Sequence, residues 1–137
     1  AATAASKALA SPTYGEPEIA RGNLGWAHFQ RKDLQRAWKE LHEAVSRAPG
    51  FCVGRYRLAK VYVERGDLDL AAEQLDAVFA DKRCPIQEAY LLGGLVAQRR
   101  KEPDKARELL DRCITLAPKS CQAAECRRYA GMVRGSN

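Results

Sequence analysis

The sequence predicts an all-α protein built of helix-turn-helix repeats that stack into a right-handed superhelix. The first observation behind this prediction is a fixed period, since the small residues Gly25, Ala59 and Gly94 stand 34 and 35 residues apart. Further columns keep the same spacings: Ala37, Ala71 and Ala106; Leu41, Leu75 and Leu110. The second observation is that the apolar residues inside each period follow a helical spacing. Repeats of this length are typical of solenoids, in which neighbouring units complete each other's core.

The composition agrees with one soluble helical domain. The chain has 137 residues, of which 46% are hydrophobic and 29% charged, with a net charge of +6. This apolar fraction excludes a disordered tail. No apolar run approaches the roughly 20 residues that a membrane-spanning helix needs.

Each repeat divides into two predicted helices at a polar break. Asp33 and Asp67 are expected to cap the second helices of their repeats, and Pro103 fits the first turn of another. Full repeats are predicted over 18–51, 52–85 and 87–120. Residues 1–10 are similar to the second helix of an earlier, partial repeat, and 121–134 form a C-terminal helix. The small columns predict close helix crossings, where a larger side chain would force the helices apart.

The pattern N-L-G-x-A…D-L-x-x-A…L-x-x-A-V…P at 23–49 resembles a tetratricopeptide repeat. The second unit departs from it with Arg83 where the closing proline is usual, and the third with Gly93 where leucine is usual. The resemblance implies a binding scaffold without catalysis, although such a fold alone does not name a function. A carboxylate clamp of the chaperone-docking type is absent, because Gly22 and Trp26 stand where that clamp needs Lys and Asn.

A second resemblance concerns the link at 11–17 and the segment 92–106. The link is longer than usual and contains Tyr14 and Pro17, and the segment carries G-L-V…K-x-P-x-x-A. Both are similar to the repeat lipoproteins that act as pilotins for type IV pilus secretins (the PilF, PilW and Tgl type). This resemblance implies a secretin subunit or another pilus-assembly protein as partner. It also implies the periplasmic face of the outer membrane, reached through a lipid on an N-terminal cysteine that this sequence lacks. The alternative is a generic adaptor, which can be cytoplasmic.

Five cysteines are many for a chain of this length in a reducing compartment. No C-x-x-C pair occurs, so the spacing does not predict a metal site. Cys52 and Cys84 fall at equivalent corners of adjacent repeats, and Cys126 lies on the helix facing Cys113. We therefore expect the bridges Cys52–Cys84 and Cys113–Cys126, with Cys121 free; the alternative is that Cys113 is a small buried hydrophobe. Either bridge would favour an oxidising, periplasmic compartment.

The first helices of tetratricopeptide units line the concave face, so the resemblance assigns a groove there. Its predicted members are Trp26, Phe29, Gln30, Tyr56, Lys60, Leu91, Leu95 and Tyr129. Apolar patches and aromatic anchors usually mark protein interfaces, and a peptide strand or helix is the expected ligand. The alternative is that Trp26 and Phe29 pack on the link at 11–17.

Catalysis and cofactors are not expected. His28 and His42 lie 14 residues apart with no nucleophile motif around either, and His28 occupies a predicted core position. The basic clusters at 99–101 and 127–128 are short and have acids close by, which makes RNA binding a distant third hypothesis. The sequence thus predicts a protein partner, no nucleic acid, no metal and no cofactor.

Overall fold

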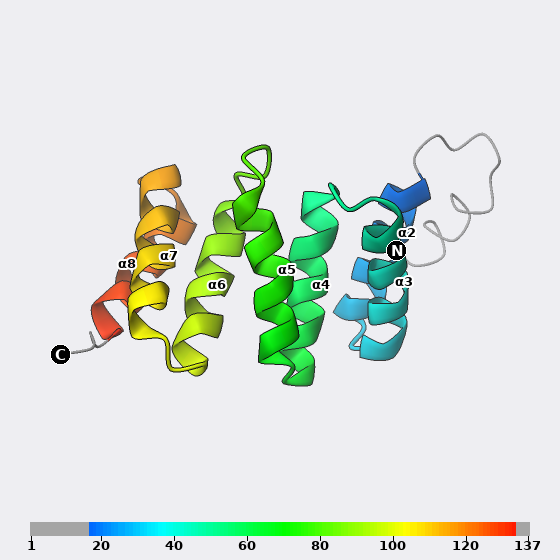
Figure 1. Ribbon diagram of the computed structural model, residues 1–137, viewed down its shortest axis with the longest axis horizontal. Coiled ribbons are helices and arrows are strands. Elements are labelled where there is room, and N and C mark those ends of the chain that lie inside the picture. Colours follow the sequence, from blue (N-terminus) through cyan, green and yellow to red (C-terminus); the bar gives the residue numbers. More distant parts are fainter. Residues whose placement is uncertain (1–16, 134–137) are drawn as a thin grey trace. The chain divides into compact units, whose positions relative to one another are not determined.

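The computed structural model describes residues 17–133, and all regular structure in this range is α-helical (Figure 1). The helices fall into two compact units, divided between Asp67 and Leu68. The predicted partial repeat at 1–10 lies outside the described residues. Within the described range, no helix is long and apolar enough to span a membrane.

The first unit contains α2 (Pro17–Gln30), α3 (Leu34–Arg47) and α4 (Cys52–Arg65). Asp33 caps α3 as predicted, because its side chain accepts a hydrogen bond from the backbone N–H of Arg36 at 3.2 Å. Gly66 ends α4 in the left-handed region, with φ of 82°. α2 packs against α3, and α4 contacts both of them.

The crossing of α2 and α3 is as close as the small residues predict. A Cβ atom on Gly25 would lie 2.7 Å from Cγ of Leu41 and 3.2 Å from the carbonyl oxygen of Ala37. Both Leu41 and Ala37 are fully buried. The small residues that recur in the sequence therefore allow the two helices to cross closely, as predicted.

The second unit contains α5 (Leu68–Ala80), α6 (Gln87–Arg99), α7 (Pro103–Leu116) and α8 (Cys121–Met132). Pro103 occupies the first turn of α7, as predicted. The α6–α7 crossing repeats the geometry of the first unit, since a Cβ on Gly94 would lie 2.6 Å from Cγ of Leu110. One core cluster of this unit consists of buried residues of α6, α7 and α8 and the residue that follows α8: Tyr90, Ala97, Ala106, Leu109, Leu110, Cys113, Cys126 and Val133.

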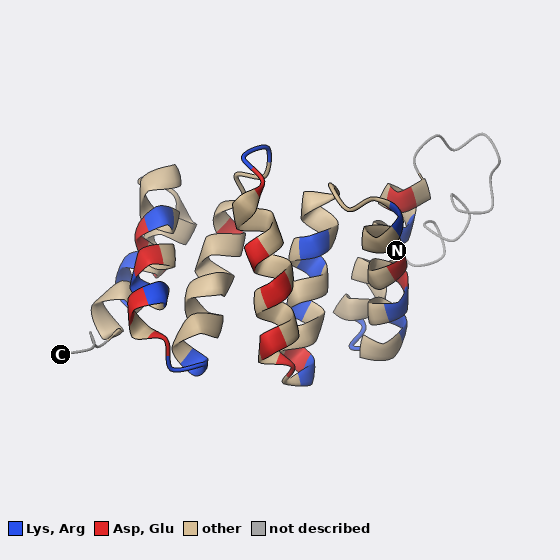
Figure 2. Ribbon diagram, viewed as in Figure 1, with Lys and Arg blue, Asp and Glu red and all other residues tan. Residues whose placement is uncertain are grey.

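Charge is distributed unevenly over the helices (Figure 2). α5 carries only acidic charges, and two of them pair within the second unit: Asp69 with Arg100 at 3.1 Å and Asp76 with Lys105 at 3.2 Å. α4 carries mainly basic charges. The acidic helix thus has cationic partners inside its own unit.

Candidate protein-binding surface

The predicted groove residues of the first unit form an aromatic pair on α2. The rings of Trp26 and Phe29 are stacked, with centroids 4.9 Å apart and planes 10° from parallel. Both side chains are half-buried, whereas the core around Leu24 and Leu41 is aliphatic. These rings therefore lie at the accessible edge of the helix and outside the fully buried core.

Two cations of α4 lie over the same aromatic pair. The guanidinium carbon of Arg57 is 5.2 Å from the centroid of the Trp26 ring, and Nζ of Lys60 is 5.7 Å from it. Lys60 also lies 5.9 Å from the Tyr56 ring. Arg57 donates a hydrogen bond to Oδ1 of Asn23 at 3.2 Å. We call Trp26, Phe29, Tyr56, Arg57 and Lys60 the α2–α4 face.

Partial burial lowers the pKa of Arg57, an effect that exceeds the opposing influence of Tyr56. The sequence predicted four members of the α2–α4 face and missed Arg57. No residue spacing predicts this role, because it depends on the distance between the Arg57 guanidinium and the Trp26 ring on another helix.

A hollow of about 390 Å³ continues the face toward the C-terminal end of α2. Phe29, Gln30 and Leu34 line it, together with Lys32 and Glu64. Gln30 was predicted as a groove residue and contributes to this hollow. The lining thus combines apolar side chains with one acidic and one basic group.

Phe51 closes the other end of the contact between α2 and α4. A Cβ on Gly22 would lie 2.7 Å from the ring of Phe51, and a Cβ on Gly54 would lie 2.6 Å from the same ring. The absence of side chains at these two glycines gives the ring its place between the helices. The accessible part of the face therefore begins one turn further along α2, at Trp26.

Two of the three groove residues predicted in the second unit pack against its core. Leu91 and Tyr129 pack against the core of that unit, and Leu95 is half-buried. The guanidinium of Arg128 covers the Tyr129 ring at 4.9 Å. Leu91 and Tyr129 thus contribute to core packing, in part because α8 lies against both α6 and α7.

The cysteines are largely oxidised in the structure. Cys113 and Cys126 form a disulfide, with Cα atoms 6.3 Å apart, and both are fully buried between α7 and α8. Cys52 and Cys84 are each disulfide-bonded, and their pairing with one another stays a prediction. Cys121 is a free, exposed thiol.

A polar network that the sequence did not reveal ties α6 to the end of α7. Nε2 of Gln87 donates to the carbonyl oxygens of Cys113 at 2.8 Å and Ala117 at 3.2 Å. The Ser120 hydroxyl donates to Oε1 of Gln87 at 2.9 Å and also caps α8. One amide side chain thus satisfies two carbonyls at a helix end.

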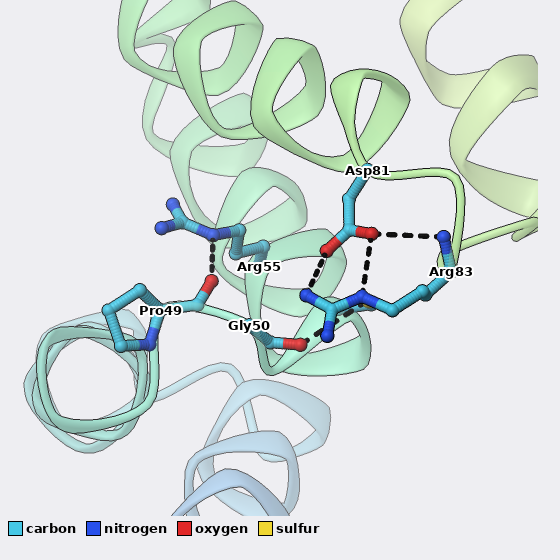
Figure 3. A network of polar contacts seen from close by, with 6 residues as sticks. Pro49, Gly50, Arg55, Asp81 and Arg83 are labelled. Atoms are coloured by element: carbon cyan, nitrogen blue, oxygen red, sulfur yellow. Dashed lines mark hydrogen bonds and ion pairs between the residues drawn. The ribbon is translucent and has the colours of Figure 1, made fainter.

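Side chains also secure the loops of each unit (Figure 3). In the first unit, Nε of Arg55 donates to the carbonyl oxygen of Pro49 at 2.7 Å. In the second, Asp81 accepts from both the backbone and the guanidinium of Arg83, at 2.9 and 3.1 Å, and these bonds lower the pKa of Asp81.

The two histidines lie on different helices of the first unit. His42 stacks on Trp38, with ring centroids 4.6 Å apart. His28 is half-buried in the last turn of α2, so its predicted burial in the core is wrong. At the end of the helix, its side chain reaches solvent.

Helix pairs with close crossings at Gly25 and Gly94 define an all-α helical-repeat protein. The family model that matches this chain is that of the tetratricopeptide repeat, over residues 56–120. No curated protein sequence matches the chain at a significant level. The matched segment includes most of α4 and all of α5, α6 and α7.

Solved structures share this fold at low sequence identity. The crystal structure of MamA has a TM-score of 0.82 at 20% identity, and the match covers 96% of this chain and 74% of MamA. The first tetratricopeptide domain of Spaghetti (RPAP3), bound to the HSP90 peptide SRMEEVD, has a TM-score of 0.76 at 16% identity, covering 84% of this chain and 90% of that one. PilW, a widely conserved type IV pilus biogenesis factor, has a TM-score of 0.76 at 23% identity, covering 90% of this chain and 56% of PilW. The predicted all-α tetratricopeptide fold is confirmed.

Proposed function

We propose that this protein is a non-catalytic scaffold that binds a segment of another protein on the α2–α4 face. The observation that carries the proposal is the grouping of Trp26, Phe29 and Tyr56 with Arg57 and Lys60 outside the aliphatic core. Aromatic and arginine side chains supply most of the binding free energy in protein interfaces. The fold supports the proposal further, since one structure that shares it holds a bound peptide.

The test is to remove the aromatic anchors while keeping the helices. Peptides are first selected from a random library on the immobilised protein. The double variant Trp26→Ala, Tyr56→Ala should bind the selected peptides at least about tenfold more weakly, the loss expected for hot-spot residues. Leu116→Ala is the matched control, because it removes an exposed apolar side chain from α7.

Circular dichroism establishes that both variants keep their helices. Full binding by a helical double variant would show that the α2–α4 face is not the binding site.

A more specific role is that of a pilotin, which would assist the assembly or outer-membrane placement of a type IV pilus secretin. Two observations favour it: the likeness to PilW, and the disulfide-bonded cysteines, which suit an oxidising compartment. In this role the partner is a secretin subunit or another pilus-assembly protein, and a lipid on an N-terminal cysteine outside this sequence anchors the protein. A generic peptide-binding adaptor remains the alternative role.

Deletion of the protein from its source organism tests the pilotin role. The amount of secretin multimer in outer-membrane fractions should fall, and the lipidated protein should restore it. An unchanged multimer, or a native protein with five reduced thiols, would contradict this role.

A further inference from the structure

The chemistry of the bound segment follows from the cations of the α2–α4 face, on the assumption that the proposed function holds. We propose that the segment is acidic, and that its carboxylates pair with Arg57 and Lys60 while an apolar side chain two positions away enters the hollow beside Phe29.

Arg57 and Lys60 differ from seven other cations within residues 17–133, each of which pairs with a carboxylate. Within residues 17–133, no carboxylate forms an ion pair with either of them. Basic side chains elsewhere do form such pairs: Arg21, Arg36, Arg47, Arg65, Arg83, Arg100 and Lys105. The polar partner of Arg57 is the neutral amide of Asn23. Two neighbouring cations on one face therefore retain the capacity to bind an anion.

Partial burial strengthens the interaction that Arg57 can make with an anion. Its guanidinium is partly buried, and this desolvation lowers its pKa; the Trp26 ring centroid lies 5.2 Å from it. A partly buried cation gains more from an opposite charge than an exposed one, because water screens the pair less. The Trp26 ring offers the Arg57 guanidinium a cation–π contact, which a carboxylate would complement.

The position of the apolar side chain follows from the surroundings of the two cations. Phe51 fills the space beside Gly22 and Gly54, so an inserted side chain has no room at that end. At the other end, Phe29 and Leu34 give a hollow apolar walls, and its two charged lining residues, Lys32 and Glu64, have opposite signs, so the hollow suits an apolar side chain. Trp26 and Gln30 are one helical turn apart, about 6 Å. This distance corresponds to about two residues of an extended segment.

The experiment selects random peptides on the whole immobilised chain. Peptides that also bind the double variant Trp26→Ala, Tyr56→Ala are discarded. We expect the enriched sequences to contain Asp or Glu two positions from a large apolar residue. An enriched peptide is then labelled, and its binding is measured by fluorescence anisotropy beside the same peptide with Gln in place of Glu.

Each of Arg57→Gln and Lys60→Gln should weaken binding of the acidic peptide by roughly tenfold, the effect of losing one charged hydrogen bond, and should reduce its advantage over the Gln peptide. Lys39→Gln is the matched control, since it removes the same charge from an exposed position on α3. Added salt should weaken the acidic peptide more than the Gln peptide.

The outcomes separate this inference from the proposed function. Enrichment of neutral or basic peptides that still need Trp26 and Tyr56 would overturn the acidic preference and leave the binding face intact. Equal effects of Arg57→Gln, Lys60→Gln and Lys39→Gln would also overturn it. Failure to enrich any peptide that prefers the unaltered face would overturn both.

Discussion

The indole Nε1 of Trp38 donates a hydrogen bond to the phenolic oxygen of Tyr62 over 3.0 Å, which joins α3 to α4 across the first unit. Tyr62 is buried, and Trp38 also stacks on His42. A buried phenol that lost this donor would keep its desolvation cost without compensation. The bond therefore stabilises the position of α4, the helix that carries Arg57 and Lys60.

Replacing Trp38 by Phe should lower the free energy of unfolding by about 1 kcal/mol, because the hydrogen bond is lost while an aromatic ring remains. Urea unfolding followed by circular dichroism measures the change. In a double-mutant cycle with Tyr62→Phe, the two losses should be less than additive. Fully additive losses would show that the two groups do not interact.

Gly94→Ala should destabilise the second unit by about 1–2 kcal/mol, because the added Cβ collides with Leu110 and this cost exceeds the gain in helix propensity. Leu110 is fully buried. The control is Gly131→Ala on α8, where a Cβ would meet nothing within 4 Å. That variant should be neutral or more stable by up to about 1 kcal/mol. Equal effects of the two substitutions would contradict the close crossing of α6 and α7.

One cysteine of the five should react with an alkylating reagent in the denatured, non-reduced protein, and intact mass measures the number. The structure assigns this thiol to Cys121, and peptide mapping checks the assignment. Five alkylated cysteines would contradict the disulfides and favour a reducing compartment.

Loss of the Cys113–Cys126 bridge should lower stability by about 3 kcal/mol, as expected for closing a loop of this size. The cysteines are 13 residues apart and join α7 to α8. The double variant Cys113→Ala, Cys126→Ala allows the measurement without reductant, so that other disulfides remain. Hydrogen exchange should then show faster opening of α8, and unchanged protection there would contradict its dependence on the bridge.

The carboxyl group of Asp81 should titrate below the ordinary pKa of an aspartate, because the side chain and backbone N–H of Arg83 stabilise its charged form. A lowered pKa in the folded state adds stability above the pKa of the unfolded chain, and this stability is lost as the pH falls through the folded value. NMR titration of Asp81 measures the shift. Arg83→Gln should move the midpoint upward; an unchanged midpoint would show that the interaction is not made in solution.

Periodicity predicted the fold well, since the small and leucine columns mark helix crossings that the structure contains at Gly25–Leu41 and Gly94–Leu110. The resemblance to tetratricopeptide repeats assigned Trp26, Phe29, Tyr56 and Lys60 to neighbouring first helices. The contribution of Arg57 could not be read from a spacing, because it depends on the distance between its guanidinium and a ring on another helix. The Gln87 network was missed for a similar reason, since its acceptors lie 26 and 30 residues away.

Aromatic rings rest on helical glycines in both units: Phe51 on Gly22 and Gly54, and Phe79 on Gly93. A side chain introduced at any of these glycines meets a ring within 3 Å of its Cβ. A larger residue at one of these glycines therefore requires a smaller residue in place of the aromatic ring, so that the total side-chain volume is kept. Each ring and its glycines must therefore be substituted together. A variant of the α2–α4 face can change Trp26 alone, whereas a change at Gly22 also requires a change at Phe51.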